Sequence, residues 1–139
     1  MDKFKNLKLE DDVVTGKYNY YDGEVDVEFD LEEDDTEMDD FSELISDANN
    51  WIENLTQENL NELKTKIAKE LTDSAYSDSD YKPTEKDYKD LENELTLTDV
   101  RFFPDQVISL VFKAKKEYPD MDIYCQIDNE FQVEDLFVE

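Results

Sequence analysis

The chain has 139 residues, of which 40 are Asp or Glu, 14 are Lys or Arg and none is His, so its formal charge at pH 7 is −26. A charge of this sign and size repels nucleic-acid phosphates and anionic membrane surfaces, and it attracts basic protein surfaces. The lack of histidine removes the commonest general base and the commonest metal ligand. Periodic apolar residues and an aromatic content of 12% predict that the chain folds, as a single domain over residues 1–139.

The first part of the chain predicts strands. An extended opening over residues 4–9 precedes a strand over residues 13–21, and Asp22-Gly23 is typical of a type I′ hairpin turn. Residues 24–31 alternate between apolar side chains and carboxylates, which indicates a half-buried strand whose outer face is acidic. Residues 32–40, which follow, are almost all acidic.

The hydrophobic period then changes to that of helices. Apolar residues at 3- and 4-residue spacing predict an amphipathic helix over residues 41–55, with Thr36 as a candidate N-cap. Thr56 is expected to cap a second helix, and Thr84 a shorter third one. Residues 74–81 are rich in Ser and Asp, which predicts a loop between these two helices.

Strands return in the last third of the chain, over residues 96–103, 106–114, 121–127 and 131–138. A turn at Pro104-Asp105 separates the first two. Residues 106–114 are apolar on both faces, which predicts a central strand covered on both sides. The whole pattern predicts an α+β fold in the order β-hairpin, three helices, β-meander. We expect a largely antiparallel sheet with about three helices packed on one face.

Four short segments carry a resemblance to a known family: Thr15-Gly16-Lys17, the hairpin from Asp22 to Val27, the helix start from Thr84 to Tyr88, and Pro104-Asp105. With the two-helix middle, they resemble the small acidic bacterial domains of unknown function in the family numbered 2262. Gln106 stands where that pattern leads us to expect glycine. The family implies no catalytic residue. Domains of this size and acidity are also similar to the immunity proteins that bacteria encode beside toxins.

The candidate binding surface is the tract of residues 22–40, which holds twelve acidic residues and no Lys or Arg. Two interpretations stay open: a docking surface for a basic protein, or a solvated strand face, loop and helix start. Tyr76 and Tyr81 are added because aromatic residues in a polar loop often anchor interfaces, whereas Trp51 is predicted at the edge of the core. The candidate partner-binding residues are Asp30, Glu32, Glu33, Asp34, Asp35, Glu37, Asp39, Asp40, Tyr76 and Tyr81.

No catalytic residue, cofactor or metal site is expected. No segment has the spacing of a calcium-binding loop, and Cys125 has no histidine to activate it, so we predict a buried structural cysteine. The first residues lack the apolar run of a secretory signal, which favours a cytoplasmic location. The predicted partner is a basic protein, and no direct contact with nucleic acid or membrane is expected.

The function that the resemblance implies is that of a non-enzymatic immunity protein, which neutralises a basic toxin such as a nuclease through its acidic face. Two alternatives remain open. One is a DNA mimic that occupies the phosphate groove of a DNA-binding protein. The other is a housekeeping domain whose acidity only confers solubility.

Overall fold

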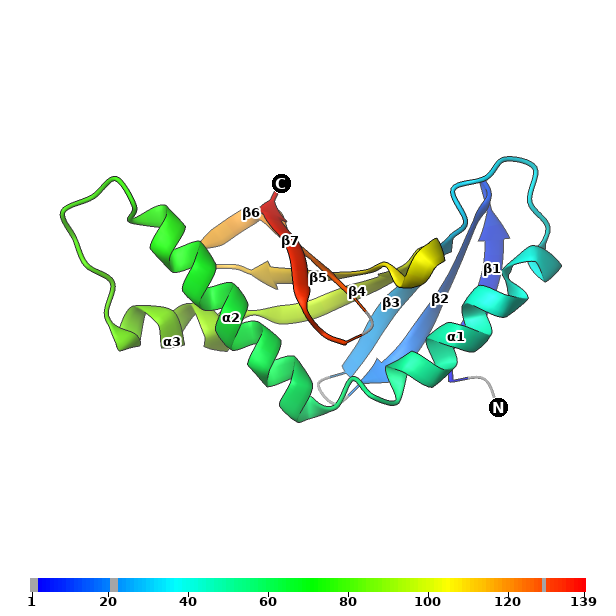
Figure 1. The fold of residues 1–139 in the computed structure, drawn as a ribbon, viewed down its shortest axis with the longest axis horizontal. Coiled ribbons are helices and arrows are strands. Elements are labelled where there is room, and N and C mark those ends of the chain that lie inside the picture. The colour runs from blue at the N-terminus through cyan, green and yellow to red at the C-terminus, as the bar shows by residue number, and fades with distance from the viewer. Residues whose placement is uncertain (1–2, 21–22, 129) are drawn as a thin grey trace.

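The computed structural model describes residues 3–20, 23–128 and 130–139, which form one seven-stranded sheet and three α-helices (Figure 1). The strands are β1 (Lys5–Glu10), β2 (Val13–Tyr20), β3 (Gly23–Asp30), β4 (Thr96–Phe102), β5 (Ile108–Ala114), β6 (Tyr118–Ile127) and β7 (Val133–Val138). The helices are α1 (Ser42–Ile52), α2 (Gln57–Ala75) and α3 (Glu85–Glu94), and two short 3₁₀ helices are η1 (Met38–Phe41) and η2 (Pro104–Gln106). The predicted α+β class is confirmed.

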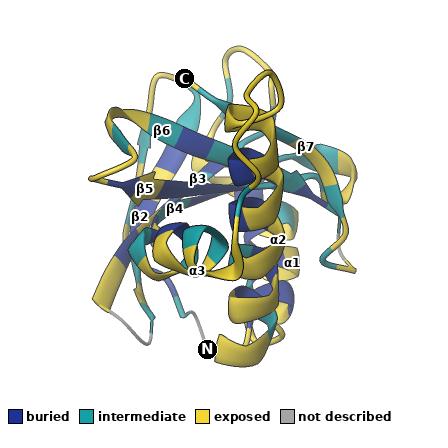
Figure 2. Ribbon diagram, turned by 90° about the vertical axis from the view of Figure 1, so that its left-hand side faces the viewer, coloured by how far each residue is buried: buried dark blue, intermediate teal, exposed yellow. Residues whose placement is uncertain are grey.

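The strands lie side by side in sequence order, and neighbours are antiparallel except for β3 and β4, which are parallel. A parallel pair needs a long crossover connection, and the three helices provide it here. Figure 1 and Figure 2 show α1 and α2 on one face of the sheet, and α3 packs against α2 and reaches β5. The sheet is therefore largely antiparallel, as the sequence predicts.

One core fills the space between the sheet and the helices. On β3 the predicted alternation is confirmed, because Val25, Val27 and Phe29 are buried while Glu24 and Asp26 are exposed. The helices contribute the apolar stripes expected from their spacing. Their buried members include Ile45, Ala48 and Ile52 of α1, Leu60, Leu63, Ile67 and Leu71 of α2, and Leu91 of α3.

The starts of α2 and α3 follow their local sequence. Thr56 Oγ1 accepts a hydrogen bond from the backbone N–H of Asn59 at 3.1 Å, and Thr84 Oγ1 accepts one from that of Asp87 at 3.4 Å. The Asp87 carboxylate in turn accepts from the backbone N–H of Thr84 at 2.8 Å, which completes a capping box. Both predicted N-caps are confirmed.

The first hairpin turns at Asp11 and Asp12, which the sequence did not single out. Their φ angles of 50° and 64° are both in the left-handed region, as a two-residue type I′ turn requires. The next hairpin pairs as far as Tyr20 with Gly23, the first residue of β3. Of the predicted Asp22-Gly23 turn, Gly23 has a positive φ of 134°, and Asp22 lies outside the described residues.

Gly16 is a site of close approach between β1 and β2. A Cβ at this position would lie 2.7 Å from Leu7 Cδ2 and 2.9 Å from the carbonyl oxygen of Lys5. Because no side chain fits at these distances, glycine is the residue that lets β1 pack here.

The prediction that β5 is central is confirmed, and the prediction that both its faces are covered is only partly right. Leu110 is fully buried in the core, and Val111 on the opposite face is 1% exposed. Lys113, on the same face as Val111, is exposed. Asp99 of β4 and Tyr124 of β6 are the pairing partners of Val111, so neighbouring strands, not a second layer, flank it.

Cys125 lies inside β6 and is fully buried, as predicted for a structural cysteine. Burial raises the pKa of its thiol to about 12. Since the thiolate is the reactive form, the native thiol has little nucleophilic character at neutral pH.

We expect Cys125 to resist a soluble thiol reagent in the native protein at pH 8 and to react at once in 6 M guanidinium. At a pKa of about 12 the thiolate fraction is roughly 10³-fold below that of a free cysteine, and burial blocks access as well. Stopped-flow absorbance with an aromatic disulfide reagent measures both rates. A native rate equal to that of free cysteine would contradict the buried position.

Candidate functional site: an acidic loop beside an apolar groove

The residues between β3 and α1 form an exposed, irregular segment at the right-hand end of Figure 1. We call residues 31–40 the acidic loop; its last residues begin η1. Glu32 and Asp35 have φ angles of 58° and 56°, in the left-handed region that Asp adopts more readily than most residues. The loop holds seven of the ten predicted partner-binding residues, and Asp30 lies directly before it.

Three carboxylates hold this loop in place. Asp12, at the tip of the first hairpin, accepts hydrogen bonds from the backbone N–H of Thr36 at 2.9 Å and from its hydroxyl at 3.0 Å. Asp30 Oδ1 accepts from the N–H of Glu32, and Asp40 Oδ2 from the N–H of Glu37, both at 2.8 Å. Asp30 and Asp40 therefore have a structural role in addition to any role in binding.

The prediction that Thr36 caps the helix after the acidic run is wrong. Its hydroxyl is engaged by Asp12, and Glu37 occupies the N-cap of η1 with Asp40 three residues later. The 3₁₀ turn moves the start of regular helix to Ser42. A contact with a hairpin distant in sequence thus replaces the local cap.

The acidic tract of residues 22–40 is not uniform in its charge environment. On β3, Asp26 is paired with Lys17 of β2, and Glu28 lies 3.4 Å from Arg101 Nε of β4. The sequence showed no compensating cation because these partners come from neighbouring strands. Within the described residues, no ion pair reaches the acidic loop. Its exposed carboxylates are Glu32, Glu33, Asp34, Asp35, Glu37, Asp39 and Asp40.

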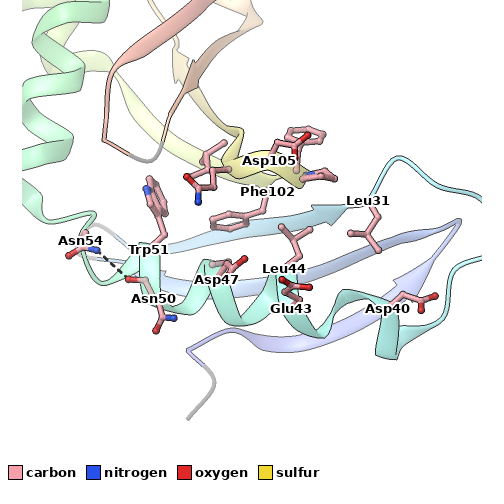
Figure 3. Close-up of a pocket in the computed structure, with 15 residues that line it drawn as sticks. Leu31, Asp40, Glu43, Leu44, Asp47, Asn50, Trp51, Asn54, Phe102 and Asp105 are labelled. Carbon is pink, nitrogen blue, oxygen red and sulfur yellow. Dashed lines mark hydrogen bonds between the residues drawn. The ribbon is translucent and has the colours of Figure 1, made fainter.

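A groove of about 620 Å³ runs beside the acidic loop, between α1 and η2 (Figure 3). Figure 3 shows Leu44 and Trp51 on α1 directed toward Phe102, with Asp105 on the turn opposite. The floor is apolar and consists of Leu31, Leu44, Trp51, Phe102, Phe103 and Pro104. Carboxylates form the rim: Asp40, Glu43 and Asp47 on the helix side and Asp105 on the turn side.

Asp40 belongs to both the acidic loop and the groove, so the two form one continuous acidic surface. The spacing of Asp40, Glu43 and Asp47 by three and four residues is visible in the sequence and is typical of one side of a helix. In the structure Asp40 lies on η1, and Glu43 and Asp47 lie on α1. Nothing in the sequence around Asp105 indicates that it lies at the groove, because the pairing of β4 with β3 is what brings it there.

Trp51 is the only tryptophan of the chain and lies at one end of the groove. It is 8% exposed, as predicted for the edge of the core, and its ring stacks on Phe131 with centroids 5.3 Å apart. It meets Phe102 edge-on, with centroids 5.8 Å apart. Its buried indole N–H has no hydrogen-bond partner among the described residues.

The turn that forms the opposite wall has an unusual backbone. Asp105 and Gln106 are consecutive residues with φ angles of 63° and 62°. Left-handed conformations are unfavourable for residues other than glycine, and they gather at ligand-binding sites. At Gln106 the sequence resemblance led us to expect glycine, and the positive φ of this residue is a conformation that glycine adopts readily.

Tyr76 and Tyr81 lie away from the acidic loop, in the α2–α3 connection at the left-hand end of Figure 1. They are 38% and 48% exposed, and their ring centroids are 4.9 Å apart. The hydroxyl of Tyr81 donates to Asp87 Oδ2 at 2.7 Å, so this ring is tied to the capping box of α3. The structure does not bring the two tyrosines together with the eight predicted carboxylates.

Across the part of the chain that the structure describes, no three Asp, Glu or Cys side chains gather as metal ligands. None of the described helices has the length and apolar character needed to cross a membrane.

Comparison with protein-family models, with curated proteins and with solved structures yields no match. The resemblance to the 2262 family and to immunity proteins therefore stays a prediction.

We expect Asp12 to make part of the stability pH-dependent. The hydrogen bonds from the Thr36 backbone and hydroxyl hold the pKa of Asp12 below its ordinary value of 3.8. Because the folded pKa is the lower one, this contribution is complete above the unfolded value and is lost as pH falls through the folded value. Asp12→Asn keeps an acceptor but cannot titrate, so its stability should fall less steeply below about pH 4.

Chemical unfolding from pH 7 to pH 3 measures this difference. Asp11→Asn, at the neighbouring turn residue, changes the net charge equally and serves as the control. Parallel curves for the wild type and Asp12→Asn would show that the bonds to Thr36 do not form.

We expect Gln106→Gly to raise the free energy of unfolding by about 0.5–1 kcal/mol. Glycine removes the cost of the left-handed conformation, and its greater freedom in the unfolded chain offsets part of that gain. Urea denaturation measures the change. Gln132→Gly, at an exposed loop position, should instead lose stability. A loss of stability in both variants would contradict the left-handed backbone conformation at residue 106.

Proposed function

We propose that this chain is a non-enzymatic binding protein for a basic protein, and that it acts as an immunity-type inhibitor of a basic toxin. The observation that supports this best is the continuous row of exposed carboxylates along the acidic loop and the α1 rim of the groove. Among the described residues, none of the carboxylates of the loop or of that rim has an ion-pair partner.

The contrast with β3 supports a docking role over a merely solvated face. Where acidic side chains are part of the sheet, the chain supplies Lys17 and Arg101 to offset them. Among the described residues, no such partner reaches Glu33, Asp34 and Asp39 of the acidic loop. Since close like charges destabilise a fold, a basic partner relieves this repulsion when it binds.

The physical consequence is fast, salt-sensitive association. Lys and Arg of a partner form charge-assisted hydrogen bonds with exposed carboxylates, and the long-range field raises the encounter rate toward ~10⁸ M⁻¹s⁻¹ at low salt. A nuclease is a suitable target class, because a site built to hold phosphate is basic. Rapid capture benefits an inhibitor that must bind a toxin before the toxin acts.

The proposal is tested with the product of the gene adjacent to that of this protein, expressed and purified together with it. We expect the two to co-purify and the chain to suppress the toxicity of that product. Glu33→Gln, Asp34→Asn and Asp39→Asn combined should lower the association rate at low salt about tenfold or more, because these carboxylates are exposed and accept no hydrogen bond from the described residues.

A matched control neutralises the same number of exposed acids elsewhere: Glu58→Gln, Glu62→Gln and Asp78→Asn. Stopped-flow binding at several salt concentrations should leave this control close to the wild type. Equal rates and full protection in both triple variants would rule out capture by the acidic loop.

A further inference from the structure

The groove between α1 and η2 combines an open apolar floor with a rim of carboxylates. Leu44, Phe103 and Pro104 on its floor are only half buried, so apolar area remains open to solvent. Glu43, Asp47 and Asp105 on its rim are exposed, and in the described part of the chain no cation pairs with them. The site is therefore apolar at its centre and anionic on both walls.

This arrangement restricts the ligand that fits. An acidic or neutral apolar segment would desolvate the rim carboxylates without replacing their water contacts, which costs free energy. A purely basic segment would pair with the rim carboxylates but leave the apolar floor exposed to water. A segment that is both apolar and cationic complements the floor and the rim together.

We propose that the groove takes a cationic amphipathic segment of the partner, whose large apolar side chain packs on the half-buried Leu44, Phe103 and Pro104. Lys or Arg on either side of it meet Glu43 and Asp47 on the helix wall and Asp105 on the turn wall. This inference rests on the proposed function, because it assigns the place where the basic protein is anchored.

The spacing of the helix wall sets the register of the segment. Glu43 and Asp47 lie about one turn of α1 apart, which is about 6 Å at the usual rise per residue, and Asp40 precedes them on η1. A partner helix with basic residues at positions i, i+3 or i+4, and i+7 repeats this spacing and keeps its apolar stripe between them.

The groove is also rigid, which lowers the cost of binding. One wall is a helix whose buried side contributes Ile45, Ala48 and Ile52 to the core. The other is a turn that begins at Pro104 and is closed by a hydrogen bond of 3.0 Å from the Phe103 N–H to the Val107 carbonyl. Aromatic floors of this kind supply most of the affinity in many interfaces.

Trp51 provides the readout, because it is the only tryptophan and lines the groove. The probe is a synthetic amphipathic helix of about fourteen Leu and Lys residues without aromatic groups, titrated into the full chain at low salt. An oligolysine of equal charge is the comparison. We expect a saturable change in Trp51 emission with the Leu–Lys peptide, and binding without that change with oligolysine, measured by calorimetry.

Three variants locate the binding. Leu44→Ala removes floor area, and Asp47→Asn and Asp105→Asn remove charge from the two walls; asparagine tolerates the left-handed backbone at residue 105. Each should raise the Kd of the Leu–Lys peptide about fivefold or more. Met121→Ala, at an exposed apolar residue outside the groove, and Glu62→Gln are the matched controls and should bind as the wild type.

Two results would overturn the inference while leaving the proposed function in place. One is equal binding of both peptides without any change in Trp51 emission, which would indicate capture by charge alone. The other is unaltered affinity in all three groove variants. Failure of both peptides to bind at low salt would also overturn the inference. The co-purification with the neighbouring gene product tests the proposed function separately.

Discussion

The parallel pairing of β3 with β4 joins the first three strands to the last four, and the candidate site depends on it. At this junction Phe29 and Phe102 stack with ring centroids 5.1 Å apart and an interplanar angle of 13°. The same pairing brings Arg101 to Glu28 and places η2 opposite α1. The groove exists because the helical crossover returns the chain beside β3.

The charge of −26 is distributed over groups with different roles. Some carboxylates are neutralised across strands, as Asp26 is by Lys17, and others hold backbone N–H groups, as Asp12 and Asp87 do. Within the described residues, the exposed carboxylates of the acidic loop and groove rim have no ion pair, and of them only Glu37 and Asp40 accept a backbone hydrogen bond, in the capping box of η1. The charge environment therefore differs among the acidic residues, and the total charge alone does not locate the candidate surface.

Features that depend on nearby residues were predictable. The caps at Thr56 and Thr84 rest on side chains within three residues, and the alternation of residues 24–31 rests on the two-residue period of a strand. Thr36 failed as a cap because Asp12, distant in sequence, competes for its hydroxyl. Five of the seven residues in the acidic loop that were named for binding are exposed and free of structural hydrogen bonds to the described backbone, but Tyr76 and Tyr81 belong to another end of the molecule.

The sequence by itself determined the fold class, the central position of β5, the burial of Cys125 and the sign of the net charge. Periodicity and composition decide these properties, because burial of apolar faces and net charge need no knowledge of distant contacts. Only the tertiary structure decided which carboxylates lack a counter-ion and where an apolar floor meets them. Coulombic attraction and packing act over a few ångströms in space, and residues such as Asp47 and Asp105 become neighbours only after the sheet is assembled.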